Sequence, residues 1–542
     1  MEDLQNLGLG ETREIFWGAP QIFHEHFARL FDFMVLGLPF VLFALWGATI
    51  LYPLYRWYAI VRKGQPENRF DQLGIRLERM VFEGIGQGRV VREPAGVAHQ
   101  VLFVSFLILF AGTALITVEA DTKLDFYFGA FYGLYKLMMD MAGVGLMVTS
   151  GYFLYRRYAI APRALEQPGQ MVDNFENESG YGFPLTMLFL IGLTGFMLES
   201  ARIVADPGSS VGLAFVGGSL AGVFRAMGTG KTFHYGVWVI HMAIVLGFLY
   251  SLTSTKLRHM FIAPVNIFFK RLGPGYRATP VTDFENAETF GVEKVEEYTW
   301  KQLLDMAACL ECGRCTLNCP TVNTNKALNP KHLVMRQREQ LVARHGVSFL
   351  SVQLAKFTGS DAGGDDTQAG GEGENVALRE PGSGKPLLGG ENGHDDAWLA
   401  QADMINDVAT EDVIWGCTTC GWCEEGCPVA IEHIQRIVDM RRNGVLMRAE
   451  FPQDLAKSFK GTENQSNPWG ISADQRTEWA RELEVPQMAE LDEDEKVDVL
   501  YWVGCAGSFD ERNQKTSKAL VKIFRQAGVK FGILGMEEGC TG

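Results

Sequence analysis

Two runs of cysteine constrain the fold of this chain more than any other feature of its sequence. Each run has the spacing C-x2-C-x2-C-x3-C followed by proline; the first comprises Cys309, Cys312, Cys315 and Cys319, and the second Cys417, Cys420, Cys423 and Cys427. Thiolates are soft ligands that suit iron, and a four-iron cubane needs four of them converging on one point. The sequence therefore predicts two 4Fe–4S clusters.

The tandem spacing also predicts which cysteines share a cluster. In this pattern three closely spaced cysteines bind one cluster, and the fourth reaches across to the other. We therefore expect one cluster on Cys309, Cys312, Cys315 and Cys427, and the other on Cys417, Cys420, Cys423 and Cys319. Zinc is the alternative metal, but zinc sites usually take paired C-x2-C knuckles rather than this spacing with its trailing proline.

Apolar residues, 47% of the 542-residue chain, are concentrated before about residue 265, whereas charged residues are concentrated after it. Because roughly 20 helical residues cross a bilayer core, five stretches are candidate membrane spans: about 33–54, 97–118, 131–154, 181–198 and 233–255. The loop Arg56–Arg92 carries eight basic residues and is expected in the cytoplasm. This orientation places the N-terminus outside and everything after the fifth span in the cytoplasm.

Three histidines in or near the apolar stretches are candidate ligands of haem b. His241 and His259 are eighteen residues apart, which is five whole helical turns, so they share one face if the fifth helix continues through His259. His99 opens the second helix at the level of His259, and this pair is expected to hold one haem iron. The alternative is that each is an ordinary interfacial histidine.

A second haem would need another ligand opposite His241. The position expected for that ligand in the second helix is Leu109, which cannot bind iron. The remaining candidates on the outer side are His234, His24 and His26.

Lys136 and Asp140 lie one turn apart in the third span and are candidates for a quinone site. Ionisable residues inside a membrane often serve a substrate or a proton pathway. The alternative is an ordinary ion pair between residues four apart near the outer boundary.

The sequence pattern predicts a mixed fold with four parts. Residues 1–32 form an extracytoplasmic segment, 33–265 a five-helix transmembrane haem b domain, 266–495 a helical two-cluster ferredoxin-like domain, and 496–542 the start of an α/β cysteine-rich domain. Helices are expected at 298–308 and 431–447, next to the two cysteine runs. A stretch at about 359–396, rich in glycine and acidic residues, is expected to be a flexible insertion.

The last part of the chain has the pattern strand, cysteine turn, helix, strand, at about 497–503, 513–527 and 529–534. Cys505 and Cys540 stand beside glycine turns and are candidate metal ligands, although buried apolar cysteines are the alternative. Because the chain stops after one crossover, we expect it to be a piece of a longer protein.

The membrane part resembles the gamma subunit of respiratory nitrate reductase. The resemblance is carried by five spans, by His99 in the second, and by His241 and His259 followed by Pro264 in the fifth. It implies that His99 and His259 together hold the haem nearer the cytoplasm. Leu109 replaces that family's ligand for the other haem.

The part after the spans resembles the D-type subunit of heterodisulfide reductase and the iron–sulfur subunit of glycolate oxidase. Both cysteine runs carry this resemblance, together with the opening of a CCG repeat, in which Cys505 and Cys540 fit the first positions and Thr541 replaces the second of two adjacent cysteines. A fusion of the two parts is similar to the membrane-bound iron–sulfur oxidoreductases that take electrons from electron transfer flavoprotein and reduce menaquinone.

The resemblance implies a respiratory oxidoreductase in the lipid bilayer of the bacterial cytoplasmic membrane. Its cofactors would be two 4Fe–4S clusters and haem b, with a further iron–sulfur cluster in the CCG region as an additional prospect. One alternative is a quinol-linked reductase of a heterodisulfide or another disulfide. Another is a non-catalytic electron-transfer subunit of a larger complex. The net charge of −15 argues against nucleic acid as a partner.

Overall fold

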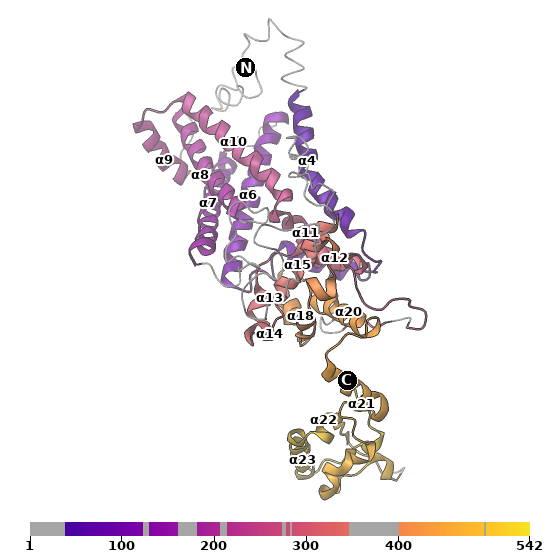
Figure 1. Cartoon of the computed structure of the whole chain (residues 1–542). Coiled ribbons are helices and arrows are strands. Elements are labelled where there is room, and N and C mark those ends of the chain that lie inside the picture. Colours follow the sequence, from indigo (N-terminus) through magenta and orange to yellow (C-terminus); the bar gives the residue numbers. More distant parts are fainter. Residues whose placement is uncertain are drawn as a thin grey trace, which may run out of the picture. The chain divides into compact units, whose positions relative to one another are not determined.

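A computed structural model describes residues 38–122, 129–160, 182–205, 214–273, 278–281, 284–345, 400–492 and 495–541. Helices dominate, and the chain forms two compact units, Met1–Met440 and Arg441–Gly542 (Figure 1). The boundary predicted at 495/496 falls inside the second unit. The domain limits from the sequence therefore stay a prediction. The insertion expected at 359–396 lies outside the described residues.

Four described helices are long and apolar enough to cross a membrane, over Pro94–Ile116, Phe131–Ile160, Gly182–Val204 and Thr232–Ser254. They correspond to α6 (Pro94–Thr122), α7 (Gly129–Tyr155) with its π-helical end η3 (Arg156–Ile160), α8 (Gly182–Ala205) and α10 (Lys231–Ser254). Helix α6 packs against α7, α7 against α8, and α8 against α10. These helices coincide with four of the five predicted spans.

The first predicted span falls on α4 (Leu38–Val61), which packs against α10 but is not one of those four helices; its expected start at 33–37 lies outside the described residues. Five spans therefore stay a prediction.

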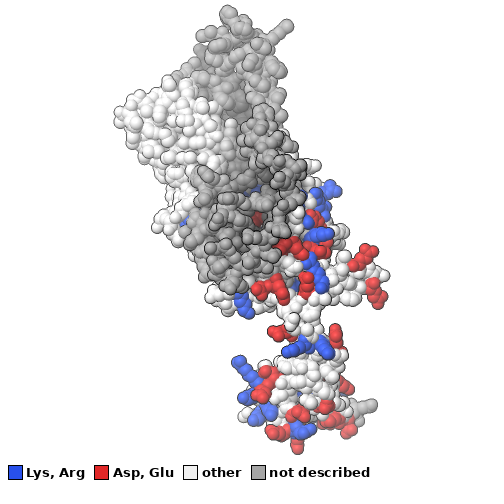
Figure 2. All heavy atoms as spheres, viewed as in Figure 1, with Lys and Arg blue, Asp and Glu red and all other residues white. Residues whose placement is uncertain are grey.

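The surface of these helices is apolar, as is typical of a membrane protein. Val148, Met141 and Val239 expose 64%, 60% and 59% of their surface. Figure 2 shows few charged side chains on the visible face over the membrane helices and many on the rest of the described chain. Apolar exposure on this scale is unfavourable in water and indicates contact with lipid.

The fifth predicted helix does not continue through His259, contrary to the sequence argument about its face. Helix α10 ends at Ser254, Thr255 adopts an extended conformation, and a 3-10 turn η5 (Lys256–Arg258) precedes α11 (His259–Phe268). The Thr255 hydroxyl accepts a hydrogen bond from the Leu257 N–H and so caps the new turn. His241 and His259 therefore lie on separate helices.

Short elements lie between the longer helices along the chain. They are α5 (Leu73–Arg79) and π-helical η2 (Met80–Ile85), which lie against α11, and α9 (Phe215–Ala226), which lies against α8.

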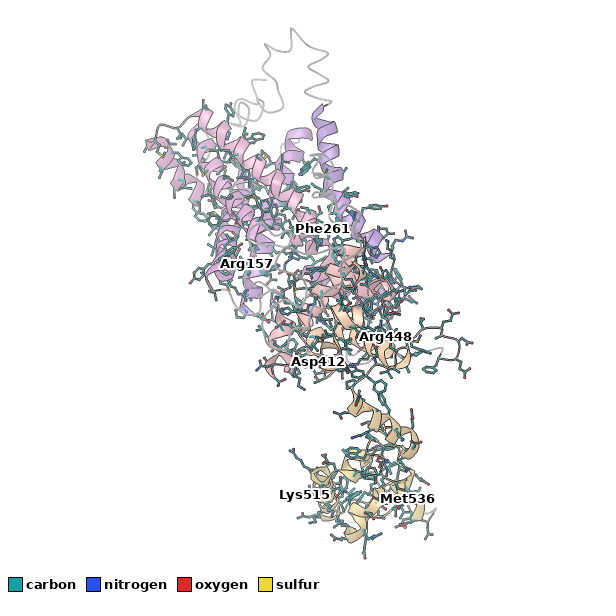
Figure 3. All side chains as sticks on the ribbon, in the orientation of Figure 1. Arg157, Phe261, Asp412, Arg448, Lys515 and Met536 are labelled. Carbon is teal, nitrogen blue, oxygen red and sulfur yellow. The ribbon has the colours of Figure 1, made fainter. Side chains whose placement is uncertain are left out.

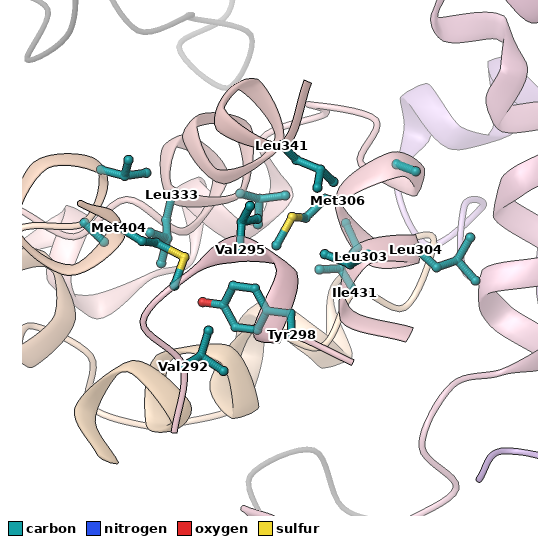
Figure 4. Close-up of a cluster of buried hydrophobic side chains, with 14 of the residues drawn as sticks. Val292, Val295, Tyr298, Leu303, Leu304, Met306, Leu333, Leu341, Met404 and Ile431 are labelled. Carbon is teal, nitrogen blue, oxygen red and sulfur yellow. The ribbon is translucent and has the colours of Figure 1, made fainter. Parts of the chain in front are cut away.

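The cysteine runs lie in a helical body whose core also takes in Trp57 and Ile60 of α4 and Ile262 and Ala263 of α11. Its elements are η6 (Val295–Glu297), α12 (Trp300–Ala308), α13 (Arg314–Leu317), α14 (Pro320–Asn323), α15 (Pro330–His345), η7 (Met404–Val408), α18 (Glu411–Trp415), α19 (Trp422–Glu425) and α20 (His433–Leu446). Helices α12 and α20 confirm the two helices predicted beside the cysteine runs. Tyr298, Leu303, Met306, Leu333 and Met404 pack together at the centre of this core (Figure 4).

The second unit contains the predicted strand–helix–strand pattern. Its elements are α21 (Gln453–Gln465), η8 (Ala473–Leu483), η9 (Met488–Glu490), β1 (Val499–Leu500), α22 (Gly504–Phe509), α23 (Glu511–Gln526), β2 (Phe531–Gly532) and η10 (Gly535–Glu537). Strands β1 and β2 pair in parallel, with Val499 opposite Phe531. Val521 of α23 packs with Phe531 and Trp479 in a small core.

Candidate metal centres

The two cysteine loops have the same backbone conformation. Gly313 and Gly421 occupy equivalent positions and have φ angles of 74° and 81°. Glu311 and Thr419, two residues earlier in each loop, have φ angles of 55° and 54°. Left-handed residues turn the chain sharply, and glycine adopts this conformation without a steric cost. This repeated turn lets three closely spaced cysteines face one point.

Each loop encloses a cavity whose fourth cysteine comes from the other loop. The first-loop cavity is lined by Cys309, Cys312, Cys315 and Cys427. The second-loop cavity is lined by Cys417, Cys420, Cys423 and Cys319. The structure thus brings together the two sets of four that the spacing predicts, while metal ligation itself stays a prediction.

The two cavities differ in the charge of their other lining residues. Glu311, Arg314, Lys331 and His433 line the first-loop cavity. No charged side chain of the described residues lines the second-loop cavity, whose other lining includes Leu328, Trp422, Ile434 and Ile437. Cys420 is exposed, and Trp422 exposes 41% of its surface, so the second-loop cavity also lies nearer to the surface.

Glu311, inside the first cysteine run, forms a buried ion-pair network. Its carboxylate accepts a hydrogen bond from the Lys256 ammonium at 2.5 Å and another from the Arg338 guanidinium. Burial alone would raise the pKa of Glu311, but Arg338 and Lys256 hold that pKa well below its usual range. Burial lowers the pKa of Lys256 to about 8, against the opposite effect of Glu311. Arg157 of η3, labelled in Figure 3, is another positive group that acts on Lys256.

Two arginines join the first-loop cavity to the segment before α6. The Arg314 guanidinium donates hydrogen bonds to the carbonyl oxygens of Arg89 and Val90 at 2.8 and 2.7 Å. In return, the Arg89 guanidinium donates to the carbonyl oxygens of Cys427 and Glu424 at 2.8 and 2.9 Å. Both cysteine runs are therefore bonded directly to residues just ahead of α6.

His99 and His259 face each other beside this junction. Their ring centroids are 6.3 Å apart, and the ring planes differ by 49°. Nδ1 of His99 lies 3.1 Å from the Gln87 Oε1, and Nδ1 of His259 lies 2.7 Å from the carbonyl oxygen of Lys256. These acceptors favour the tautomer with the proton on Nδ1, which leaves Nε2 of each ring free to bind a metal.

His241 lies in the middle of α10 and has a similar arrangement. Its Nδ1 is 2.8 Å from the Thr194 hydroxyl oxygen, and that hydroxyl donates to the Leu190 carbonyl oxygen at 2.6 Å. The threonine oxygen therefore accepts from the histidine, which again leaves Nε2 free. Leu109 packs in an apolar cluster with Leu146 and neighbouring side chains.

Of the other histidines considered for a second haem, His24 and His26 lie outside the described residues. His234 is buried in the first turn of α10, where Arg202 and Glu199 are its charged neighbours.

Lys136 and Asp140, on α7, belong to a buried polar cluster that α8 and α9 complete. The Lys136 ammonium lies 3.7 Å from the Glu199 carboxylate, which Arg202 also binds at 3.0 Å. The Asp140 carboxylate accepts a hydrogen bond from the Val216 N–H at 2.9 Å, in the first turn of α9. Asp140 thus caps a helix, a role that the sequence did not predict.

Cys505 and Cys540 meet in the second unit. Their thiols share a hydrogen bond, and the Arg476 guanidinium lies 3.3 Å from the Cys505 sulfur. Glu538 pairs with Arg476 at 3.0 Å and accepts the N–H groups of Val503 and Gly504. The structure brings the predicted pair together, while a cluster at this place stays a prediction.

Sequence reasoning missed the charged surroundings of the first-loop cavity. Glu311 and Arg314 stand between the cysteines, so their position was visible, but their partners Lys256 and Arg338 are distant in sequence. Lys331 and His433 carry no motif and enter the cavity only through the packing of α15 and α20.

Comparison with known proteins places this geometry in context. A family model described as a 4Fe-4S dicluster domain matches residues 305–431. The chain is 31% identical to EtfAB:quinone oxidoreductase of Syntrophomonas wolfei subsp. wolfei, over 95% of this chain and 68% of that protein. It is 30% identical to the probable iron-sulfur-binding oxidoreductase FadF of Bacillus subtilis, over 89% of this chain and 66% of that protein.

A more distant relative is the D-type subunit of dihydromethanophenazine:CoB–CoM heterodisulfide reductase from Methanosarcina barkeri, 23% identical over 44% of this chain and 46% of the relative. No solved structure matches the chain. The chain spans about two thirds of the length of the first two relatives. These similarities confirm the resemblance to membrane-bound iron–sulfur oxidoreductases and to the D-type subunit of heterodisulfide reductase.

Proposed function

This chain belongs to the family of iron–sulfur oxidoreductases that includes EtfAB:quinone oxidoreductase, and on that premise we propose that it passes electrons from a cytoplasmic flavoprotein to menaquinone. One observation carries the proposal. The first-loop cavity is bonded through Lys256 and Glu311 to the turn that holds His259, so a metal site and a membrane histidine pair adjoin. Such an arrangement suits electron transfer, because the protein's contribution is to hold redox groups close together.

The eight cysteines around the two cavities are proposed to hold two 4Fe–4S clusters. Among the described residues, no three or more His, Cys, Asp or Glu side chains are grouped so that they could hold a single metal ion. A zinc site needs four ligands within about 2.3 Å of one ion, whereas a cubane is large enough to fill the space between four separated thiols. The two cavities therefore fit clusters better than zinc.

His99 and His259 are proposed to hold a haem b. Two imidazoles that bind one metal through bonds of about 2 Å have ring centroids about 6 Å apart, and the observed 6.3 Å agrees with this spacing. The Gln87 side chain and the Lys256 carbonyl orient the rings and keep both Nε2 atoms available. When bound, haem and clusters would each supply a one-electron site. The chain's own residues set their position and surroundings.

His241 is proposed as one ligand of a second haem. The hydrogen bond to Thr194 supports this role, because it orients the ring as the partners of His99 and His259 do. Its opposite ligand would come from His234, His24 or His26.

The polar cluster around Lys136 and Asp140 is proposed as the quinone site. Lys136, Asp140 and His234 are all buried within helices that otherwise face lipid. Reduction of a quinone consumes protons, so its site needs an ionisable group within reach. Glu199 pairs with both Lys136 and Arg202, and with Asp140 the charges of the cluster balance.

We further propose the cellular placement that the basic loop implies. The chain would span the bacterial cytoplasmic membrane with its N-terminus outside and the cysteine loops in the cytoplasm. The proposed domains after the N-terminal segment begin at residues 33, 266 and 496.

A second candidate function is disulfide reduction with electrons from a quinol. The similarity to the D-type subunit of heterodisulfide reductase favours it, as does the contact between Cys505 and Cys540, which would serve a further cluster there. In that case electrons would enter at the membrane histidines and leave through the second unit.

One experiment separates the two candidates. The purified protein is mixed anaerobically with reduced electron transfer flavoprotein and then with a menaquinone analogue, while haem absorbance is recorded. The proposal expects reduction by the flavoprotein and reoxidation by the quinone. Reoxidation only by a disulfide would support the second candidate instead. Asp140→Asn should slow the quinone step about a hundredfold and leave reduction by the flavoprotein unchanged, since loss of a proton donor costs rates of this order.

A further inference from the structure

We propose that Lys331 and His433 raise the reduction potential of the first-loop cluster above that of the second-loop cluster, so that electrons collect beside His99 and His259. This inference rests on the proposed function, because it assumes that both cavities hold 4Fe–4S clusters. Lys331 and His433 act here as positioning residues for charge and hydrogen bonding and are not ligands.

Lys331 brings a positive charge to the wall of the first-loop cavity. It is the second residue of α15, and only 2% of its surface is exposed. Its ammonium interacts electrostatically with Glu311 and with the thiols of Cys309, Cys315 and Cys312. A reduced cluster carries one more negative charge than an oxidised cluster, so a fixed positive charge stabilises the reduced form and raises the potential.

His433 offers a hydrogen-bonding atom to the same cavity. It begins α20, exposes 3% of its surface, and its Nδ1 is buried without a hydrogen-bond partner in the described part of the chain. A buried polar atom without a partner is costly, and a ligand in the cavity would relieve that cost. An N–H from this ring to a cluster sulfur would favour the reduced form, as hydrogen bonds to cluster sulfurs do.

The remaining charges near the first-loop cavity reinforce Lys331. Glu311 is negative, but it is paired with two cations, Lys256 and Arg338. Arg314 pairs with Glu93 at 3.0 Å. Positive charge around this cavity therefore exceeds negative charge, counted over Lys331, Glu311, Lys256, Arg338, Arg314 and Glu93.

No positively charged side chain of the described residues lines the second-loop cavity, and the charged neighbour of its Cys423 thiol is the acidic Glu424. The same helix that presents His433 to the first-loop cavity presents Ile434 and Ile437 to the second. Exposed Cys420 lets water stabilise a reduced cluster there, which acts in the opposite sense. A buried charge acts through a lower dielectric, so its effect on a cluster is several times stronger than that of a charge screened by solvent. The charge of Lys331 therefore decides which of the two clusters has the higher potential.

The order of potentials gives the transfer a direction. One electron leaves the second-loop cluster, which is oxidised, and enters the first-loop cluster, which is reduced, without any proton or further reactant. A reduced flavoprotein supplies the electron and a quinone finally takes it up. The cluster with the higher potential lies on the side of the membrane histidines, and the other lies nearer to the surface.

The test is a redox titration of the full chain in detergent, followed by electron paramagnetic resonance. The wild type should show two cluster transitions. In Lys331→Met, the higher one should shift to a lower potential, with the ratio of reduced to oxidised cluster at a fixed potential falling at least about tenfold, which is 59 mV for a one-electron couple. His433→Phe should shift the same transition in the same direction by a smaller amount.

Matched variants keep the test decisive. Lys331→Arg retains the charge, and His433→Asn retains a polar group at the place of Nδ1, so both should stay near the wild-type potential. Wild-type protein without iron would refute the proposed function itself. If the wild type shows two transitions but the higher one does not move in either Lys331→Met or His433→Phe, this inference alone is overturned. A shift of the lower transition instead of the higher one would overturn it as well. If Lys331→Met loses iron, the comparison of His433→Phe with His433→Asn decides whether the inference holds.

Discussion

The two cysteine loops share a backbone and differ in side chains. Both are left-handed at the residues before and after the second cysteine. Yet Glu311 and Arg314 in the first loop correspond to Thr419 and Trp422 in the second. The shared backbone serves the convergence of thiols, which any 4Fe–4S cluster needs. The differing side chains set the surroundings, because Glu311 and Arg314 bring charge to the first-loop cavity, whereas no charged side chain of the described residues lines the second-loop cavity.

The largest expected effect tests the exchange of cysteines between the loops. Cys427→Ser should remove the first-loop cluster although the residue belongs to the second run, and Cys319→Ser should remove the second-loop cluster. Each variant should lose about half of the bound iron, because each cluster needs four thiolates. Iron and sulfide analysis with paramagnetic resonance would measure this. If Cys427→Ser instead removed the signal that depends on Cys420, the pairing between the loops would be wrong.

The second prediction concerns the membrane side of the first loop. His99→Ala or His259→Ala should abolish the b-type haem spectrum while both clusters persist, because a single imidazole cannot clamp the iron from both sides. Optical spectra of the reduced protein and iron analysis would show it. His332→Ala, on α15, is the control and should leave the spectrum unchanged. An unaltered spectrum in either test variant would refute the ligand assignment.

A third prediction concerns the buried carboxylate of Glu432, which follows the second cysteine run. Glu432 precedes His433 and accepts two hydrogen bonds from Arg69, at 2.8 and 3.0 Å. Burial opposes ionisation, but Lys301 and Arg69 lower the pKa of Glu432 to about 2. Glu432→Gln removes a buried carboxylate, while Arg69 keeps its pair with Glu67 and Lys301 its pair with Asp305, so the free energy of unfolding should fall by about 3 kcal/mol, the lower end of the range for a broken buried pair. Thermal unfolding in detergent would measure the loss.

The pH dependence follows from the same pair. Because the folded pKa lies below the ordinary value of 4.5, the stabilisation by Glu432 is fully present above about pH 4.5 and is lost as the pH falls towards 2. Glu425→Gln is the matched control, since its pair with Arg92 is exposed and should contribute at most about 1 kcal/mol. Equal losses in both variants would contradict the distinction.

The smallest expected effect tests the shared backbone. Gly313→Ala and Gly421→Ala should each cost about 1–2 kcal/mol, because both place a Cβ atom in the left-handed region. Thermal unfolding of the iron-loaded protein would compare them. A cost in one loop and none in the other would show that the two turns are not equivalent.

The sequence was most informative where a pattern is local. The cysteine spacing predicted which thiols share a cavity, and the capping pair Thr299 and Gln302 agrees with the start of α12 next to the first run. Four predicted spans coincide with apolar helices because hydropathy depends on composition alone. The break after α10 was missed, because helical spacing alone placed His241 and His259 on one helix, whereas the capping hydroxyl of Thr255 and the 3-10 turn at Lys256 are features of the folded backbone.

Long-range polar contacts could not be predicted from the sequence. Glu311 finds Lys256 and Arg338, and Arg69 finds Glu432, across separations that no periodicity encodes. Asp140 is a candidate for an ion pair or a quinone site, and its further contact with the first turn of α9 was not predicted. Such partners are set by how whole elements pack, which a single sequence does not display.

Lys256 links the ring of His259 mechanically to the first cysteine loop. Its carbonyl oxygen accepts the proton of the His259 ring, and its ammonium is anchored on the loop of the first cysteine run. A tilt of the last turns of α10, such as a change in bilayer thickness produces, would pull on both ends of one residue. Lipid composition would then be transmitted to the spacing between cytoplasmic and membrane redox groups without any moving domain.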